Sequence, residues 1–280
     1  MKIAVTGANG FIGRHVISEL ESRSISVTLV LRTVSHLPVS LAHHNVAIID
    51  IKNPPVDSYE LMGSPDVLIH LAWAGLPNYK SLHHFEEELP KQFQFLKMLI
   101  KSGLENLVVA GTCFEYGMQS GPLAENMISQ PTNPYGFAKN MLRCQLEYLQ
   151  QIKPFNLTWA RLFYIYGHGQ ANNSLLPQLT QAVERGDKLF NMSGGEQLRD
   201  YLPVTEVAKH FVSLAIMMLD WGIINICSGK PISVIKLVEY WIKKNNWSID
   251  LNLGYYSYPD HEPMAFWGDR TKLTNIMGYK

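Results

Sequence analysis

Cysteine, net charge and long apolar runs are all scarce in this 280-residue sequence. Its three cysteines are odd in number and form no CxxC pair, which argues against a disulfide framework or a zinc ribbon. Lysine plus arginine and aspartate plus glutamate each total 24, so the chain has no overall positive field to hold nucleic acid. We therefore expect a protein of a reducing, cytoplasmic compartment, with no metal site and no nucleic-acid partner.

No apolar stretch approaches the roughly 18 residues that a membrane-spanning helix needs. The first residues, MKIAVTGANG, lack the long apolar run and the small-residue cleavage site of a signal peptide. Hydrophobic residues make up 46% and charged residues 17%, which predicts a well-buried globular core rather than disorder. We expect a soluble protein with no membrane partner, built as one large domain or two modest ones of roughly 150 residues each.

Short apolar runs alternate with amphipathic helical patterns along most of the chain. The runs are continuous, which is typical of parallel strands covered by helices on both faces. Strands are expected at residues 2–6, 26–31, 46–49, 67–71, 107–110, 157–163 and 223–229. Helices are expected at residues 11–22, 85–101, 137–151, 174–186, 204–219 and 233–244. This order predicts an α/β fold of Rossmann type, a doubly wound parallel sheet with a small, interleaved C-terminal substrate-binding domain.

A glycine-rich loop, with Gly7, Gly10 and Gly13 spaced as GxxGxxG, joins the first expected strand to the first expected helix. The first glycine permits a tight turn, the second lets backbone approach a pyrophosphate, and the third lets the helix pack close to the strand. Because free N–H groups at a helix start favour a phosphate, the loop predicts a dinucleotide site rather than a glycine-rich turn without ligand. The cofactor contacts expected here are Gly7, Asn9, Gly10, Phe11, Ile12, Gly13 and Arg14.

The residues after the second and third strands indicate which dinucleotide is bound. An acid after the second strand would bind the ribose hydroxyls of NAD, but this chain has Arg32 there. Arg32 and Arg14 can each pair with a 2′-phosphate, although the alternative of two ordinary surface arginines stays open. We therefore expect NADP(H), with NAD less favoured. Asp50 and Ile51 follow the third strand and are expected near the adenine, although a solvated Asp50 is nearly as well supported.

Tyr135 and Lys139 lie four residues apart at the start of an expected helix, after the helix-start signal of Asn133 and Pro134. Residues at that spacing share one helix face, so the ammonium is expected to stabilise the phenolate and to lower the tyrosine pKa from about 10. Such a tyrosine can exchange a proton with an alcohol or a ketone. Thr112 follows the fifth strand, and its hydroxyl can bind the same substrate oxygen.

With these motifs in place, the chain resembles the extended short-chain dehydrogenase/reductase family, in its nucleotide-sugar epimerase/dehydratase branch. The matching segments are residues 6–13, 66–75, 111–117, 135–139, 161–170, 199–209 and 268–279, which span nearly the whole chain in family order. The resemblance implies that Tyr135 is the general acid/base, that Lys139 holds the nicotinamide ribose, and that Thr112 is the third catalytic residue. The expected domains are a dinucleotide-binding domain of residues 1–166 plus 203–229 and a small nucleotide-sugar-binding domain of residues 167–202 plus 230–280.

The same resemblance implies further contacts by position. Leu71, Ala72 and Trp73 would line the cofactor, and Trp73, in place of a small residue, would shape the sugar pocket. Arg199 would bind the nucleotide diphosphate, unless it forms a structural ion pair, and Arg270 is a weaker candidate for the same role. The implied substrate-binding residues are Trp73, Thr112, Asn172, Asn173, Leu175, Arg199 and Arg270.

Departures from the family pattern bear on the reaction. Cys113 and Phe114 stand where the 4,6-dehydratases carry Asp-Glu, so dehydration is disfavoured. Glu115 comes one residue later and does not match, although a contact with the sugar stays open. Cys113 has no histidine or asparagine partner of a nucleophile, so a small apolar core residue is the favoured interpretation.

Two activities remain, both on a nucleotide-diphosphate sugar. A 4-epimerase holds NAD tightly and returns the hydride to the other face, whereas a reductase exchanges NADPH and delivers a hydride to a 4-keto sugar. Arg32 favours the reductase, so we expect an NADPH-dependent reductase of a nucleotide-diphosphate 4-keto-6-deoxyhexose, in surface-polysaccharide (O-antigen) precursor synthesis. A catalytically silent NAD(P)-binding protein is the remote alternative, disfavoured because Thr112, Tyr135 and Lys139 are all present.

A homodimer is expected, because members of the family often pair the helices that correspond to residues 85–101 and 137–151. The apolar faces of these helices carry Phe93, Leu96, Leu142 and Leu146. The same side chains can instead face the sheet, so the pattern leaves both arrangements open.

Overall fold

The computed structural model describes residues 1–33, 41, 43–258 and 262–278. Seven strands form its main sheet, in which every neighbouring pair is parallel. Their spatial order is β11 (Gly222–Ile226), β7 (Asn156–Leu162), β5 (Asn106–Thr112), β4 (Val67–His70), β1 (Ile3–Thr6), β2 (Val27–Leu31) and β3 (Asn45–Ile48). The predicted α/β fold of Rossmann type is confirmed, and the expected strands differ from these only by a few residues at their ends.

The strand order reverses at the centre of the sheet. From β1 the chain adds β2 and β3 on one side, and then β4, β5, β7 and β11 on the other. Ligands of open parallel sheets bind at such a reversal, in the crevice outside the carboxyl ends of the strands. The loops after β1 and β4 both lie at this point, which is where the glycine loop and residues 71–73 occur in the sequence.

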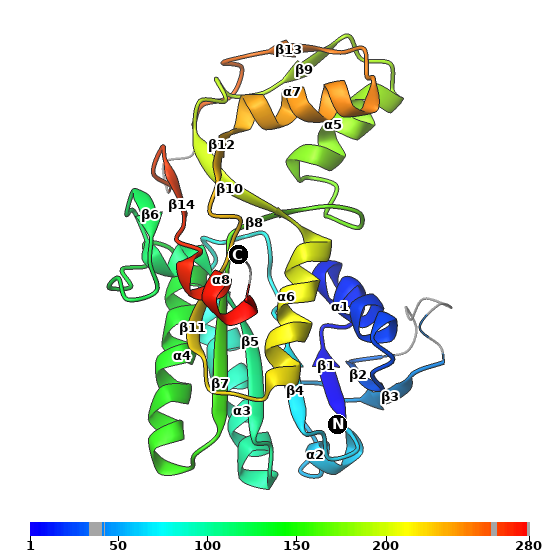
Figure 1. Ribbon diagram of the computed structural model, residues 1–280, viewed down its shortest axis with the longest axis vertical. Coiled ribbons are helices and arrows are strands. Elements are labelled where there is room, and N and C mark those ends of the chain that lie inside the picture. The colour runs from blue at the N-terminus through cyan, green and yellow to red at the C-terminus, as the bar shows by residue number, and fades with distance from the viewer. Residues whose placement is uncertain (34–40, 42, 259–261, 279–280) are drawn as a thin grey trace.

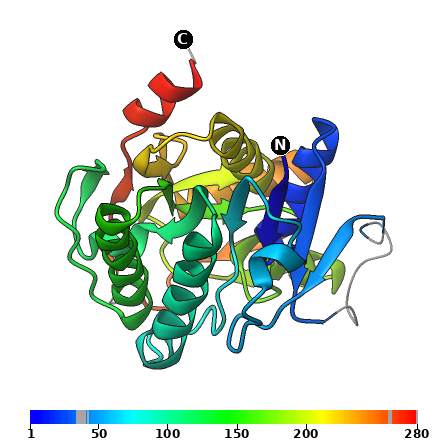
Figure 2. The ribbon, with the colours of Figure 1, turned by 90° about the horizontal axis from the view of Figure 1, so that it is seen from below.

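Helices cover both faces of the sheet (Figures 1 and 2). One face carries α1 (Phe11–Ser22) and α6 (Val204–Met217), and the other carries α3 (Leu89–Ser102) and α4 (Pro134–Ile152), with the short α2 (Ser58–Leu61) beside α3. Within β1, Ile3 and Val5 pack in the core of the first face and Ala4 in that of the second. A strand buried on both sides must be apolar at every position, which explains the continuous runs in the sequence.

The apolar faces of α3 and α4 are directed toward the sheet. Leu96, Leu142 and Leu146 are fully buried in the core that these helices form with the strands, and Phe93 packs against it. Of the two arrangements that the sequence left open, the structure has the inward one. The three leucines are therefore not accessible to a second chain.

A second, smaller core lies beyond the carboxyl edge of the sheet, at the top of Figure 1. It is formed by α5 (Leu175–Glu184), β9 (Leu189–Asn191), α7 (Val234–Asn245) and β13 (Asp250–Asn252), with Leu179, Phe190 and Trp241 among its buried residues. A three-stranded sheet of β8 (Tyr164–Tyr166), β10 (Leu198–Pro203) and β12 (Pro231–Ser233) leads into it. This is the interleaved C-terminal unit that the change of pattern after residue 166 indicates.

The end of the described chain differs from the expected division, in which residues 230–280 belong to the small domain. Helix α8 (Thr271–Met277) packs against β11, and its Leu273 is fully buried in the core shared by α1 and α6. Just before it, β14 (Phe266–Gly268) pairs with β6 (Gly121–Leu123). Since an uncovered β11 would expose apolar surface, α8 returns to the main sheet; so short a helix gives too weak a pattern to show this. Among the described residues, none of the helices is both long and apolar enough to cross a membrane.

Candidate active site

The glycine loop leaves no room for side chains where β1, α1 and β4 meet. Gly7 has a φ of +69°, and a Cβ on it would lie 2.9 Å from the backbone nitrogen of Ala72. A Cβ on Gly13 would lie 2.1 Å from the carbonyl oxygen of Gly7, so only glycine lets α1 pack this close to the loop. The loop therefore presents bare backbone and the amino end of α1 at the reversal of the sheet, an arrangement that fits a pyrophosphate.

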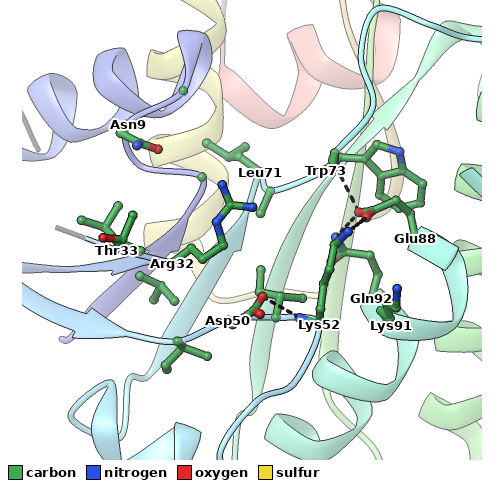
Figure 3. A pocket seen from close by; sticks show the side chains of 18 residues that line it. Asn9, Arg32, Thr33, Asp50, Lys52, Leu71, Trp73, Glu88, Lys91 and Gln92 are labelled. Atoms are coloured by element: carbon green, nitrogen blue, oxygen red, sulfur yellow. Dashed lines mark hydrogen bonds and ion pairs between the residues drawn. The ribbon is translucent and has the colours of Figure 1, made fainter. Parts of the chain in front are cut away.

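A cavity of about 380 Å³ opens beside this loop, within the usual size range of ligand sites (Figure 3). It brings together nine of the residues expected to contact the cofactor. These are Gly7, Asn9, Gly10, Arg32, Asp50, Ile51, Leu71, Ala72 and Trp73. The sequence missed Lys52, Glu88, Lys91 and Gln92, which also line the cavity. They come from the loop after β3, from the turn that precedes α3 and from the start of α3. No local pattern could have indicated them, because only the packing of α3 against the sheet places them there.

Two arginines of the predicted cofactor site have different surroundings. Arg32 follows β2 and points into the cavity (Figure 3). Arg14 is turned back onto the glycine loop, where its guanidinium donates to the carbonyl oxygens of Asn9 and Gly10, each at 3.3 Å. Arg14 does not line the cavity, and neither do Phe11, Ile12 and Gly13, which form the first turn of α1.

Thr112, Tyr135 and Lys139 converge at the carboxyl end of β5, and all three are buried. Thr112 is the last residue of β5; its hydroxyl accepts from the N–H of Phe114 at 3.3 Å and lies near enough to Tyr135 to affect the pKa of that phenol. Tyr135 and Lys139 lie in the first turns of α4, whose start Asn133 caps by accepting from the N–H of Gly136 at 2.8 Å. The structure thus brings together the three residues that the sequence proposes as catalytic.

Burial controls the protonation of this group. The Nζ of Lys139 donates to the carbonyl oxygen of Ala110 at 2.9 Å, and burial lowers the pKa of Lys139 to about 7, against the opposing effect of Glu115. Burial also raises the pKa of Tyr135 well above its usual value, with Thr112 acting in the other direction. The predicted lowering of the tyrosine pKa is therefore wrong for this structure. The ammonium lies 6.0 Å from the centre of the Tyr135 ring and is directed at Ala110, so it does not offset the loss of water around the phenol.

Tyr135 is enclosed by aromatic rings. The ring centres of Tyr79, His84, Trp73 and Phe114 lie 5.5, 5.2, 6.1 and 6.4 Å from that of Tyr135. The backbone N–H of Tyr135 also donates to the carbonyl oxygen of Tyr79 at 3.2 Å. The sequence did not indicate Tyr79 or His84, because the segment between β4 and α3, in which both lie, has no periodic pattern that would place them over α4.

A second buried network lies behind Thr112. The Glu115 carboxylate accepts from the N–H of Thr112 at 2.9 Å, and from Trp159 Nε1 and Arg161 Nε at 2.8 Å each. Glu115 and Arg161 are both fully buried. The first bond completes a capping box for the 3₁₀ turn η3 (Cys113–Tyr116). The structure therefore gives Glu115 a role that the sequence did not indicate, a fully buried core ion pair, and does not support the sugar contact that was left open.

Cys113 lies in this turn and packs in a buried cluster with Tyr116 and Phe163. Burial raises the pKa of its thiol, so the sulfur stays protonated. Cys113 is thus an apolar core residue, as the sequence favoured.

The residues expected to bind substrate are dispersed. Arg199 is buried and forms an ion pair with Glu262 at 2.9 Å. Arg270 precedes α8 and lines a separate cavity. Asn172 lines another cavity, and Asn173 is exposed in the loop before α5. Leu175, the first residue of α5, packs against the small core. Among the described residues, Trp73 and Thr112 are the members of the set that lie beside Tyr135.

One group of described residues has donor atoms close enough to share a metal ion. The ligand atoms of Glu21, His43 and His44 lie within 4.8 Å of one another. Glu21 is near the end of α1 that is remote from the glycine loop. This group is therefore separate from the cavity and from Tyr135.

Comparison with known proteins gives matches over nearly the whole chain. Residues 3–227 match the model of the family described as "NAD dependent epimerase/dehydratase family". A dTDP-6-deoxy-L-talose 4-dehydrogenase (NAD(+)) of Aggregatibacter actinomycetemcomitans is 33% identical over 273 residues, covering 96% of this chain and 99% of the relative. A GDP-6-deoxy-D-talose 4-dehydrogenase of the same organism is 27% identical over 291 residues, covering 99% and 92%.

Among solved structures, a UDP-N-acetylglucosamine 4-epimerase of Methanobrevibacter ruminantium M1, in complex with UDP-N-acetylmuramic acid, superposes with a TM-score of 0.86. The match covers 98% of this chain and 91% of the epimerase, at 21% identity. At that identity the likeness concerns the fold. It agrees with the strand order and with the small C-terminal unit described above.

Proposed function

Because this chain belongs to the NAD dependent epimerase/dehydratase family, we propose that it transfers a hydride between a nicotinamide dinucleotide and C4 of a nucleotide-diphosphate 6-deoxyhexose. The observation that carries this proposal is the convergence of Thr112, Tyr135 and Lys139 beside the glycine-loop cavity. Trp73 connects the two, because it lines the cavity and its ring packs against Lys139 and Tyr135. Reduction of a 4-keto sugar and oxidation of the 4-hydroxyl are opposite directions of one reaction. The reductase expected from the sequence and the 4-dehydrogenases among the relatives thus share their chemistry.

Tyr135 and Thr112 are both proposed to act at the C4 oxygen of the sugar. In the direction of reduction, the Oη of Tyr135 donates its proton to the forming alkoxide, while the Thr112 hydroxyl hydrogen-bonds the same oxygen. The dinucleotide, when bound, supplies or accepts the hydride. A raised pKa keeps Tyr135 protonated near neutral pH, which is the form that reduction requires. In the reverse direction Tyr135 must first release its phenol proton to solvent, and as the phenolate it then accepts the proton of the 4-hydroxyl. Lys139 is proposed to hold the nicotinamide ribose, as the family resemblance implies.

The dinucleotide proposed for this site is NAD(H), since the 33% identical relative is named for NAD(+). NADP(H) is the second candidate, and it is favoured by Arg32, which points into the cavity where no acid follows β2. The cavity is compatible with both. Asp50 and Ile51 line the same part of it and are proposed to contact the adenine.

The test is a two-way assay with product identification. The purified protein is incubated with dTDP-linked or GDP-linked 4-keto-6-deoxyhexoses and NADH or NADPH, and with the corresponding 6-deoxytaloses and NAD⁺. We expect one dinucleotide consumed per sugar converted, with the change at C4 established by NMR. A 4-epimerase would invert C4 with no net consumption of dinucleotide. Dinucleotide binding without turnover of any sugar would instead favour a silent binding protein and overturn the proposal.

A homodimer is part of the same proposal, now on different residues. Phe137, Tyr148 and Ile152 are 43%, 70% and 83% exposed, and they lie on one face of α4 with the partly exposed Met141 and Cys144. An apolar stripe of this kind is typical of an interaction surface. Sedimentation equilibrium is expected to give a dimer of the wild type and a monomer of the Tyr148→Glu, Ile152→Glu variant. A monomeric wild type would refute it.

The proposed product would enter surface-polysaccharide precursor synthesis.

A further inference from the structure

The indole of Trp73 covers the ammonium of Lys139. The Nζ of Lys139 lies 4.0 Å from the centre of the Trp73 ring, and it also donates to the carbonyl oxygen of Ala110 at 2.9 Å. Trp73 lines the glycine-loop cavity, whereas Lys139 is not among the residues that line it. The face of an indole attracts a cation, and the attraction is strongest where water is excluded, as it is around the buried Lys139.

His84 fixes this indole by a hydrogen bond with its ring nitrogen. The indole nitrogen of Trp73 lies 3.1 Å from Nδ1 of His84, and Nε2 of His84 lies 2.8 Å from the carbonyl oxygen of Asn78. Tryptophan can only donate and a carbonyl can only accept. His84 must therefore be neutral, with its proton on Nε2 and its Nδ1 accepting from Trp73. Burial of the imidazole, which lowers the pKa of His84, favours the same neutral form.

We propose that His84 is a positioning residue, which fixes the Trp73 indole over Lys139 and so stabilises the ammonium form of this buried lysine beside the cavity. The proposal rests on the proposed function only for the catalytic use of Lys139. The contact itself involves protein groups only. It opposes the desolvation that lowers the pKa of Lys139, so its loss would lower that pKa further.

Other charged and titratable groups face Lys139 from every element packed around it. Glu88 of the π-helical turn η2 (His84–Glu88) and Glu115 of η3 favour its charged form. His70 of β4 and Tyr135 of α4 are both neutral near pH 7, because burial lowers the pKa of the first to about 3 and raises that of the second. A substitution of His84 leaves all four in place, so a change in the pKa of Lys139 reports the indole.

The chain allows a matched pair of variants at position 84. In His84→Asn the side-chain oxygen takes the place of Nδ1, so the bond from Trp73 is kept and the bond to Asn78 is lost. In His84→Gln the amide takes the place of Nε2, so the bond to Asn78 is kept and the acceptor for Trp73 is lost. Trp73→Leu removes the ring altogether, so it gives the largest change in the pKa of Lys139 that loss of the indole contact can cause.

The pKa of Lys139 is measured by NMR on protein with ¹³C-labelled lysine, its signal assigned from Lys139→Met. The indole N–H of Trp73 is followed in parallel and assigned from Trp73→Phe. We expect the pKa to fall by about 0.4 to 1.5 pH units in Trp73→Leu and in His84→Gln, and to stay near the wild-type value in His84→Asn. The indole signal is expected to shift toward that of a free N–H in His84→Gln alone.

The two variants distinguish positioning from general support of the loop. If His84 only supports the loop through Asn78, the pKa of Lys139 changes in His84→Asn and stays near the wild-type value in His84→Gln. That result overturns the proposal. An unchanged pKa of Lys139 in Trp73→Leu overturns it as well. Neither measurement uses turnover, so an enzyme without activity on any nucleotide sugar would refute the proposed function and leave these outcomes readable.

Discussion

Two buried cations lie near the end of β5 and differ in whether a carboxylate pairs with them. Lys139 and Arg161 both contact an aromatic face, at 4.0 Å from the ring centre of Trp73 and 4.3 Å from that of Tyr116. Arg161 also has a carboxylate at 2.8 Å, Glu115. The cation of Lys139 is instead held by the carbonyl of Ala110.

The difference in partners gives the two cations different titration behaviour, which suits Arg161 to a structural role and Lys139 to a chemical one. Burial alone would lower the pKa of Arg161, but the pairing with Glu115 outweighs it and raises that pKa, so this guanidinium stays charged. Burial lowers the pKa of Lys139 to about 7, so this amine can gain or lose a proton near neutrality. A perturbed, nearly neutral pKa in a group beside a cavity is typical of a catalytic site, whereas a fully paired charge is typical of a structural one.

The largest expected effect is on the Lys139 side. Tyr135→Phe removes the proton donor and is expected to reduce turnover by about 10²- to 10⁴-fold, with dinucleotide affinity nearly unchanged. Tyr116→Phe is the matched control, because the Tyr116 hydroxyl donates to Asn225 in the core at 2.7 Å. That variant is expected to lose about 1–2 kcal/mol of unfolding free energy and little turnover. Initial rates and urea unfolding measure both; turnover of Tyr135→Phe within tenfold of the wild type would contradict its role.

The Arg161 side is expected to respond in stability instead. Arg161→Met leaves the Glu115 carboxylate buried without its cation and is expected to lower the free energy of unfolding by about 3–5 kcal/mol. Arg143→Met breaks the more exposed pair with Glu147 and is expected to cost less than about 1 kcal/mol. Urea unfolding of the two variants tests the contrast. Equal losses would show that burial of the pair carries no special weight.

Lys139 is expected to make stability depend on pH. Its pKa is about 7 in the folded protein and about 10.5 in the unfolded chain, so between these pH values the unfolded chain binds more protons. The free energy of unfolding therefore rises with pH, by at most about 1.4 kcal/mol per pH unit from this group. Lys139→Met is expected to lack this rise. A wild-type minus variant difference that stays constant from pH 7.5 to 9.5 would contradict the lowered pKa.

The smallest effect on turnover and stability is expected at Arg32, an exposed cation that packs in neither hydrophobic core. If it pairs with a 2′-phosphate, Arg32→Ala raises the KM for NADPH by up to about fivefold and leaves that for NADH unchanged. Unfolding free energy is expected to stay within about 0.5 kcal/mol of the wild type. Equal changes for the two dinucleotides would remove the support that Arg32 gives to NADP(H).

Predictability from the sequence followed the range of the interactions. The glycine loop and the Tyr135–Lys139 pair could be predicted, because turn geometry and helix periodicity act over a few residues. The pKa direction of Tyr135 could not, since it depends on burial under Tyr79 and His84 from the segment between β4 and α3. The apolar spacing of α3 and α4 showed that each has one buried face, but not whether that face meets the sheet or a second chain.

The sequence alone determined the doubly wound sheet, the glycine turn after the first strand and the shared helix face of Tyr135 and Lys139, because continuous apolar runs, a glycine-rich turn and i, i+4 spacing are local properties. Only the tertiary structure decided that Glu115 pairs with Arg161, that α8 returns to β11, and that an indole held by His84 covers Lys139. These depend on segments far apart in the chain that share one water-free volume, where each polar group must find a partner and the available partner sets its charge.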